Sequence, residues 1–191
     1  PEWLKIKLPK GQSSTEVLNI VRKHNLHTTC TSGMCPNQGE CWGNRTATFM
    51  IGGDVCTRSC KFCNVKTGRP APLDPAEPEN IANSVKVIEA VKRVKPETTM
   101  EVLIPDFQGR RELVQQVIEA RPEVISHNLE TVRELSDGVR SRAKYDTSLQ
   151  VIRQVSESGI VSKSGIMLGL GETREQILRT MDDLLACSQN M

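Results

Sequence analysis

The stretch CTRSCKFC, residues 56 to 63, places three cysteines within eight positions and constrains this chain more than any other feature. Three thiols are one too few for a four-thiolate zinc site and one too many for a single disulfide. A cubane iron–sulfur cluster has four irons, so three thiolates leave one iron open to an outside ligand. The spacing Cys56-x3-Cys60-x2-Cys63 therefore predicts a cluster whose fourth iron binds a small molecule.

A second cysteine triplet precedes the first one. Cys30-x4-Cys35-x5-Cys41 lies within HTTCTSGMCPNQGECW and predicts a second metal centre. The nearby His24 and His27 leave open a zinc site that combines these thiols with imidazole nitrogen. We expect instead that His24 ends a helix and that His27 is a polar loop residue.

Composition places the chain among folded globular proteins and narrows its partners. Of the 191 residues, 37% are hydrophobic and 25% are charged, and the formal net charge is +2. This charge and the small number of aromatic residues argue against a nucleic-acid-binding surface. No apolar run approaches the ~20 residues of a membrane span, and no signal peptide is visible, although the chain begins with Pro1 rather than Met. Six of the seven cysteines fall within residues 30–63, which is typical of metal binding in a reducing compartment, so we expect a cytoplasmic protein with no membrane or nucleic-acid partner.

Alternating strand and helix patterns predict an α/β fold with a parallel sheet. Hydrophobic periodicity predicts helices at 13–24, 79–95, 111–120, 145–157 and 172–187. It predicts strands at 46–51, 100–104, 123–128 and 163–169, the first of them buried, and a loop at 27–45. The sequence from Ser13 to Glu16 reads as a capping box for the first helix. Polar or glycine-rich segments follow the strands at 54–63, 106, 128–130 and 169–172. Because the carboxyl ends of parallel strands meet at one edge of a sheet, we expect these segments to converge.

The cysteine motifs and several other strings resemble a known family. CTRSCKFC resembles the cluster loop of the radical S-adenosylmethionine (SAM) superfamily. Similarity to the lipoyl synthase family runs nearly end to end, through PEWLKIKLP, HTTCTSGMCPNQGECW, ATFMIGGDVCTRSCKFCNVKTGRP, EVLIPDFQG, SHNLETV and KSGIMLGLGET. The resemblance implies that Cys56, Cys60 and Cys63 hold a [4Fe-4S] cluster whose open iron binds the amino and carboxylate groups of SAM. An electron from this cluster would cleave the sulfonium and leave a 5′-deoxyadenosyl radical, with Phe62 beside the adenine.

The resemblance also implies an activity. The substrate would be an octanoyl chain on a lysine of a lipoyl carrier protein, such as a lipoyl domain or the glycine cleavage H protein. Radicals from two SAM molecules would abstract hydrogen at C6 and then at C8 of that chain. A second [4Fe-4S] cluster, on Cys30, Cys35 and Cys41, would donate sulfur to both positions, so the chain would be a sulfurtransferase that makes the lipoyl cofactor. Because the cofactors carry this chemistry, we assign no catalytic acid or base.

Further contacts are implied by position in the family's motifs. The residues implied to contact SAM are Asn128, Glu130, Gly169, Gly171 and Glu172. Five basic residues against one aspartate lie in the segment from Arg45 to Arg69. This local positive charge suits the SAM carboxylate or an acidic carrier domain. The electron donor would be a protein such as ferredoxin or flavodoxin.

The fold implied is a partial (β/α)6 radical SAM barrel after an N-terminal cysteine-rich extension. The extension with the auxiliary cluster motif would span 1–45, and the barrel 46–191. About four of six strands are evident, because one strand–loop unit of the family has no counterpart between residues 84–86 and 89–98. The family also continues past Met191 with a sixth strand and a serine that completes the auxiliary cluster. We expect that the internal unit is missing from this sequence rather than deleted from the fold, since a barrel that lost an interior strand would expose unpaired edges.

Three alternatives stay open from the sequence. The chain could be another sulfur-inserting enzyme of the same superfamily, a two-cluster electron-transfer protein, or a zinc-dependent regulator. An electron-transfer protein would release no 5′-deoxyadenosine from SAM, and a zinc regulator would bind zinc without iron or sulfide. Of the remaining residues, we expect Cys187 to be buried without a role, and His127 to be either a buried, hydrogen-bonded residue or a functional one.

Overall fold

This computed structural model divides the chain into two compact units, Pro1–Pro75 and Ala76–Met191. The described residues are 12–23, 26–44, 46–50, 54–56, 58, 60–68, 85, 88–89, 91–140 and 142–188. The predicted division into an extension and a barrel at residue 45 stays a prediction.

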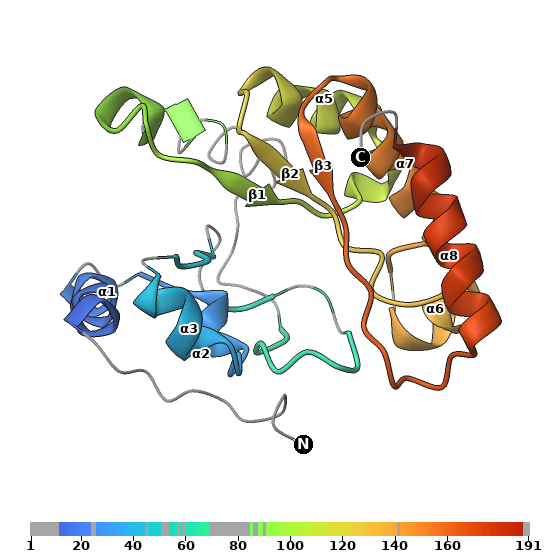
Figure 1. Cartoon of the computed structure of the whole chain (residues 1–191), viewed down its shortest axis with the longest axis horizontal. Helices are drawn as coiled ribbons and strands as arrows, with labels where there is room; N and C mark the ends of the chain where they lie inside the picture. The colour runs from blue at the N-terminus through green and yellow to red at the C-terminus, as the bar shows by residue number, and fades with distance from the viewer. Residues whose placement is uncertain are drawn as a thin grey trace. The chain divides into compact units, whose positions relative to one another are not determined.

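The described part of the first unit contains the helices α1 (Gln12–Lys23), α2 (Thr29–Ser32) and α3 (Gln38–Gly43), labelled in Figure 1. Helix α1 packs against α3 and buries Val21. The helix predicted from 13 to 24 is confirmed. Its predicted cap is wrong, because α1 begins at Gln12 and Ser13 already lies inside the helix.

Residues 27–45 contain α2 and α3, so the prediction of a loop there is wrong in part. Thr28 caps α2, since its hydroxyl oxygen accepts a hydrogen bond from the amide of Thr31 at 3.2 Å. Helix α3 buries Trp42, whose side chain is 2% exposed. Helices this short carry no sustained hydrophobic period, which is why periodicity did not predict them.

The buried strand predicted at 46–51 is wrong over its described part, 46–50. These residues make only an isolated antiparallel bridge, between Thr28 and Phe49, and Phe49 is 48% exposed. The mixture of threonine and apolar residues has strand propensity, but here it pairs with residues beside α2 rather than entering a sheet.

The second unit is built on a parallel sheet with the strand order β1 (Glu101–Leu103), β2 (Val124–Ser126) and β3 (Val161–Lys163), shown in Figure 1. In this register Leu103 lies beside Ser126, and Ser126 lies beside Lys163. The sheet is open and its connections are helical. This arrangement confirms the predicted partial α/β barrel, with three strands in the described residues rather than four.

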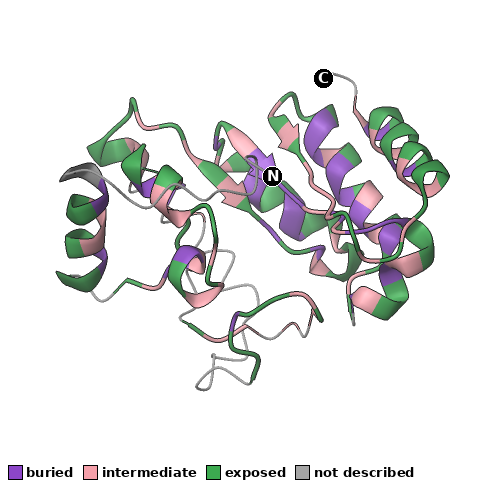
Figure 2. Ribbon diagram, turned by 60° about the horizontal axis from the view of Figure 1, so that its bottom comes forward, coloured by how far each residue is buried: buried purple, intermediate pink, exposed green. Residues whose placement is uncertain are grey.

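Helical segments connect the strands and form the core with them. The first crossover is η2 (Phe107–Gly109) with α5 (Arg111–Glu119), the second is α6 (Arg133–Val139) with α7 (Tyr145–Glu157), and α8 (Arg174–Cys187) follows β3. Ile125 of β2 belongs to one buried cluster with Val114 and Val117 of α5 and with Val151 and Val155 of α7. Figure 2 shows the buried residues gathered along these strands and helices. Burial of this cluster is the main stabilising contribution to the second unit.

The other face of the sheet mixes polar residues with the exposed apolar side chains of Leu103 and Val161. Side chains alternate along a strand, so the residues flanking Val102 and Ile125 point away from the helices. The carboxylate of Glu101 accepts hydrogen bonds from the hydroxyl of Ser126 at 2.6 Å and from the ammonium of Lys163 at 2.9 Å. This set spans all three strands on the face that a barrel turns toward its interior.

Most of the predicted elements of the second unit are confirmed. Helices predicted at 111–120 and 145–157, and strands predicted at 100–104 and 123–128, match α5, α7, β1 and β2 within two residues at each end. The strand predicted at 163–169 is wrong in its bounds, because β3 ends at Lys163 and only Ile166 makes a further isolated bridge. Helix α6 has no predicted counterpart.

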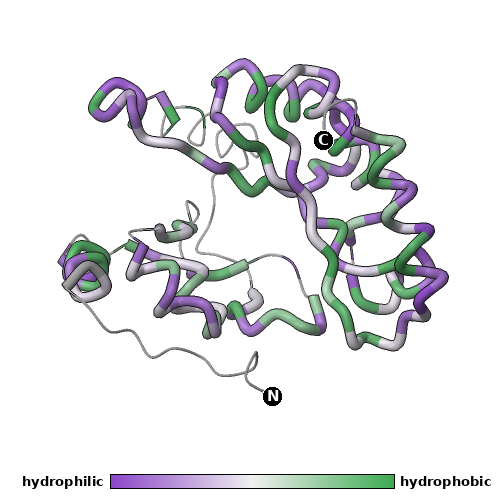
Figure 3. The backbone as a smooth tube through the Cα atoms, viewed as in Figure 1, coloured by the Kyte–Doolittle hydropathy of each residue, from purple (hydrophilic) through white to green (hydrophobic). Residues whose placement is uncertain are grey.

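The last helix begins later than predicted. The predicted start is residue 172, whereas α8 starts at Arg174, after a capping box formed by Thr173 and Gln176. Figure 3 shows polar and apolar residues alternating along α8. The helix predicted at 79–95 lies largely outside the described residues, although positions 85, 88–89 and 91–94 are helical. Within the part of the chain that the structure describes, no helix is both long and apolar enough to cross a membrane.

Candidate functional site

The three cysteines of CTRSCKFC lie on a loop that is closed at its base. Cys56 pairs with Thr67, where the Cys56 amide donates to the carbonyl of Lys66 at 2.9 Å and the Gly68 amide donates to the carbonyl of Cys56 at 3.1 Å. Within the loop, the amide of Cys63 donates to the carbonyl of Cys60 at 3.2 Å. Backbone pairing therefore holds the three thiols in one short closed segment.

The chemistry of these side chains fits thiolate ligation. All three are free thiols, and they are half-buried to exposed. The amide of Arg58 donates a hydrogen bond to the sulfur of Cys56 at 3.4 Å. Phe62, the aromatic residue implied to lie beside adenine, is half-buried next to Cys63.

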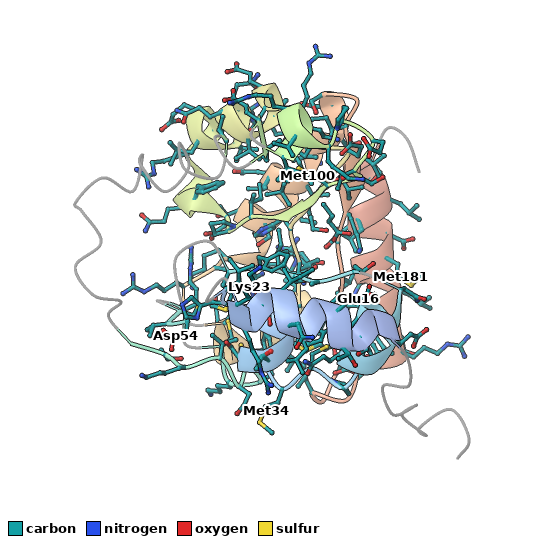
Figure 4. The ribbon with its side chains drawn as sticks, turned by 90° about the vertical axis from the view of Figure 1, so that its left-hand side faces the viewer. Glu16, Lys23, Met34, Asp54, Met100 and Met181 are labelled. Carbon is teal, nitrogen blue, oxygen red and sulfur yellow. The ribbon has the colours of Figure 1, made fainter. Side chains whose placement is uncertain are left out.

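The first triplet lies on the short helices that the sequence did not predict. Cys30 is on α2, Cys41 is on α3, and the amide of Cys35 donates to the carbonyl of Cys30 at 3.0 Å. Burial raises the pKa of the Cys41 thiol, and the neighbouring Cys30 and Cys35 raise it further. Cys30 and Cys35 therefore lie near enough to Cys41 for their charges to act on its thiol. Met34 stands in the turn between them, 76% exposed, with its side chain pointing outward (Figure 4).

Both triplets thus offer three free thiols each, a donor set that suits an iron–sulfur cluster. No three His, Cys, Asp or Glu side chains of the described residues are grouped as ligands of a single metal ion. His27 is half-buried, and its carbonyl accepts from the amide of Met50 at 2.8 Å. The predicted role of His24 at the end of a helix lies outside the described residues. Cys187 is buried as predicted, and its sulfur lies 3.8 Å from the guanidinium of Arg153.

In the second unit, the loop after β2 is held against the end of β3. The amide of Leu129 donates to the hydroxyl of Ser164 at 3.2 Å, and the amide of Glu130 donates to the carbonyl of Gly165 at 2.9 Å. The amide of Met167 returns a hydrogen bond to the carbonyl of Glu130 at 2.8 Å. The predicted convergence of segments beyond neighbouring strands is therefore confirmed for the residues after β2 and β3.

His127 anchors the same loop to β1. It is buried, its Nδ1 lies 2.8 Å from the carbonyl of Ile104, and its amide donates to the carbonyl of Lys163 at 3.0 Å. Asp106, the predicted residue beyond β1, is also buried, and its carboxylate accepts from the amide of Gln108 at 3.3 Å. Of the two readings of His127, the structure supports the buried and hydrogen-bonded one.

Glu130 has an unusual backbone and an unusual environment. Its φ is +66°, in the left-handed region that a residue with a side chain rarely adopts. Burial raises the pKa of the Glu130 carboxyl, while a hydrogen bond from Asn128 and the charge of Arg140 oppose that rise. The backbone pairs with Gly165 and Met167 on both sides, which explains how the strained conformation persists.

The turn from Gly169 to Glu172 is organised by its own carboxylate. Glu172 accepts hydrogen bonds from the amides of Gly169 and Leu170, the second at 2.8 Å. These backbone donors lower the pKa of the Glu172 carboxyl. Gly169 and Gly171 have φ values of +97° and +110°, which glycine adopts without steric cost. A Cβ at either glycine would meet no atom within 4 Å, so open space lies beside both.

Two polar features near this site were not predicted from the sequence. One is the cross-strand set of Glu101, Ser126 and Lys163 on the sheet's inner face. The other is Arg140, a buried arginine at the end of α6. A charged residue within an apolar run of the sequence would have been a hint, but in DGVRSR the only apolar side chain is that of Val139.

Comparison with known proteins identifies the family. Residues 82–184 match the model of the Radical SAM superfamily. The chain is 60% identical to the lipoyl synthase of Treponema denticola, over 96% of this chain and 73% of that protein. The chain belongs to the lipoyl synthase family. It is also 55% identical to the lipoyl synthase of Bacteroides fragilis (97% of this chain, 74% of that protein) and 53% identical to that of Porphyromonas gingivalis (97% and 76%).

Membership of the lipoyl synthase family confirms the resemblance found in the sequence and the prediction of a radical SAM enzyme. The alignment with the Treponema denticola lipoyl synthase spans 211 residues, and this chain has 191, so at least 20 aligned positions of that relative have no counterpart here. The position of the expected missing strand–loop unit stays a prediction.

Proposed function

We propose that this chain is a lipoyl synthase that inserts two sulfur atoms, at C6 and C8, into an octanoyl chain carried by a protein. The observation that carries this proposal is the presence of two separate triplets of free thiols in a chain 60% identical to a lipoyl synthase. The chain would use SAM and two [4Fe-4S] clusters, as radical SAM lipoyl synthases do. When bound, one cluster supplies the electron that cleaves SAM, and the other supplies the sulfur.

Each triplet has a defined part in the proposal. Cys56, Cys60 and Cys63 would hold the cluster that binds SAM, because backbone pairing closes their loop and three thiolates would leave one of the four irons open to SAM. The residues that would hold the auxiliary cluster are Cys30, Cys35 and Cys41. Phe62 would lie against the adenine and exclude water from one side of it.

The residues beyond β2 and β3 would bind the rest of SAM. Glu130 carries a half-buried carboxylate on a rigidly paired backbone, which suits it to accept hydrogen bonds from ribose hydroxyl groups. Asn128 supports that carboxylate with a hydrogen bond. Open space beside Gly169 and Gly171 leaves room for a ligand to approach the backbone, and Glu172 holds the turn.

The partners follow from the same assignment. The substrate would be an octanoylated lipoyl carrier, either a lipoyl domain or the glycine cleavage H protein. Lys61 and Lys66 are exposed on the cysteine loop, which favours an acidic carrier or an acidic electron donor such as ferredoxin or flavodoxin. A chain that depends on free thiols and reduced clusters belongs in a reducing compartment, so we place it in the cytoplasm.

Iron and sulfide content, measured anaerobically on the reconstituted chain, tests the assignment of the two clusters. We expect about eight irons per chain, falling to about four in Cys30→Ala and in Cys56→Ala. Iron that stays unchanged in either variant would contradict the two-cluster assignment. Incubation of the reduced chain with SAM distinguishes the enzyme from an electron-transfer protein, because only the enzyme releases 5′-deoxyadenosine. Cys56→Ala should abolish that release. Cys187→Ala is the matched control, because it removes a thiol outside both triplets.

A further inference from the structure

Arg140 is a buried charge at the junction of three segments of the second unit. It is 5% exposed and ends α6, where its amide donates to the carbonyl of Ser136 at 2.8 Å. Its guanidinium donates to the carbonyl of Leu129 and to the hydroxyl of Ser148, both at 3.1 Å. Burying a guanidinium costs free energy unless hydrogen bonds and opposite charges compensate for the lost water. The burial of Arg140 therefore needs an explanation.

The contact with Leu129 links Arg140 to the proposed cofactor site. Leu129 is fully buried and lies between Asn128 and Glu130, whose side chains are half-buried. One side of this segment is pinned to residues 164–167 by three hydrogen bonds, and Arg140 holds the carbonyl on its other side. The left-handed backbone of Glu130 follows directly after that carbonyl, so the guanidinium fixes the peptide that sets the Glu130 conformation.

We propose that Arg140 is a positioning residue of the SAM site, which holds the Leu129 carbonyl and thereby presents Asn128 and Glu130 to the ligand. This inference rests on the proposed function, because it takes those two side chains as SAM contacts. Arg140 need not touch SAM itself. It acts by fixing the position of the loop and by placing a positive charge near the Glu130 carboxylate.

The charge of Arg140 gives the proposal a signature that a purely structural role lacks. Arg140 opposes the rise that burial causes in the pKa of Glu130, so its removal raises that pKa further. Of the other groups facing Glu130, Asn128 does not titrate, and the paired backbone from Gly165 to Met167 carries no ionisable side chain. His127 lies on the same loop, with its Nδ1 against the Ile104 carbonyl. Loss of Arg140 should therefore weaken binding more at low pH, where the Glu130 carboxylate becomes protonated.

The test is the equilibrium dissociation constant for SAM, measured anaerobically on the reconstituted full chain from about pH 5.5 to about pH 8.5. We expect Arg140→Met to weaken SAM binding by about ten- to hundredfold, with the larger loss at the acidic end. Arg140→Lys keeps the charge and should weaken binding less, with the pH dependence of the unsubstituted chain. The matched control is Ser148→Ala, which removes a buried partner of Arg140 but leaves the charge and the Leu129 contact, and should lower the melting temperature with SAM affinity unchanged.

The outcomes separate the inference from the proposed function. An Arg140→Met chain that melts earlier but binds SAM with unchanged affinity and pH dependence would overturn the positioning role. If Arg140→Met does not fold, Arg140→Lys is compared with Ser148→Ala instead. If Arg140→Lys then binds SAM as tightly as Ser148→Ala does, the positioning role is overturned. If instead the unsubstituted chain, with its clusters in place, failed to bind SAM, the proposed function itself would fall before any variant was considered.

Discussion

Tyr145 offers a direct test of how the helices of the second unit are held together. It begins α7 and is 5% exposed, its hydroxyl donates to the carboxylate of Asp183 on α8 at 2.9 Å, and the guanidinium of Arg133 lies 4.2 Å from the centre of its ring. Burial is the largest cause that raises the pKa of Tyr145 to about 12, and Asp183 adds to the rise, while Thr180 and Arg133 oppose it. We predict that ionisation of this one side chain measurably destabilises the fold.

The magnitude follows from the difference in pKa between the folded and unfolded chains. An unfolded tyrosine has a pKa of about 10, so stability is intact below about pH 10 and is lost as the pH rises toward about 12. Two pKa units correspond to at most about 2.7 kcal/mol of unfolding free energy. Tyr145→Phe cannot ionise, but it loses the hydrogen bond to Asp183, which costs about 1 kcal/mol at neutral pH. The unsubstituted chain should therefore be more stable than the variant at pH ~8, and the two stability curves should cross between about pH 10.5 and 11.

The assay is urea unfolding of both chains at a series of pH values, together with the absorbance of the phenolate. Tyr145 is the only tyrosine in the chain, so the phenolate signal reports this residue alone. Lysines and cysteines titrate in the same range in both chains and cancel in the difference of unfolding free energies. A phenolate midpoint near pH 10 in the folded chain, or a difference in unfolding free energy that is the same at pH ~8 and pH ~11, would refute the reasoning.

Three further predictions concern the core, the glycine turn and the metal. Val155→Ala empties part of the cluster between β2 and α7 and should lower the unfolding free energy by about 2 to 3 kcal/mol in denaturant titrations, whereas a loss below about 0.5 kcal/mol would contradict the packing. Gly169→Ala should cost about 1 to 2 kcal/mol by backbone strain alone, because φ is +97° and the space for a Cβ is open; a much larger loss would point to a steric clash that the structure does not contain. Removal of iron with a chelator should abolish hydrogen-exchange protection around Cys30 and Cys60 but leave Ile125 protected, and equal loss in both units would contradict their separate sources of stability.

The elements that the sequence predicted well are those with a long apolar face. The bounds of α7 are the predicted ones, 145–157, because Tyr145, Val151 and Val155 lie on one buried face along most of this 13-residue helix. Helix α6 has seven residues, too few for a period to show, and α2 has four. The strand predicted at 46–51 failed for a different reason: its residues have strand propensity, but propensity does not say whether a partner sheet exists.

The candidate site likewise has parts that could be predicted from the sequence and a part that could not. The cysteine triplets could be recognised from the sequence because ligand type and spacing are local properties of the chain. The approach of Glu130 to Gly165 was predictable from strand order, since both follow neighbouring parallel strands. The role of Arg140 could not be predicted from the sequence. Its contact with Leu129, eleven residues earlier, depends on how α6 folds back against the loop that follows β2.

The two units also differ in what stabilises them. Among the described residues, the buried apolar side chains of the first unit are Val21, Cys30, Trp42 and Val65, and one of these four is itself a proposed cluster ligand. The second unit buries a continuous cluster between sheet and helices. So small an apolar set contributes little by burial, and units with little core gain stability from metal binding. In the proposed assignment, the free thiols of the first unit therefore serve two purposes: they would supply the ligands of the clusters, and the bound clusters would stabilise the segment that carries them.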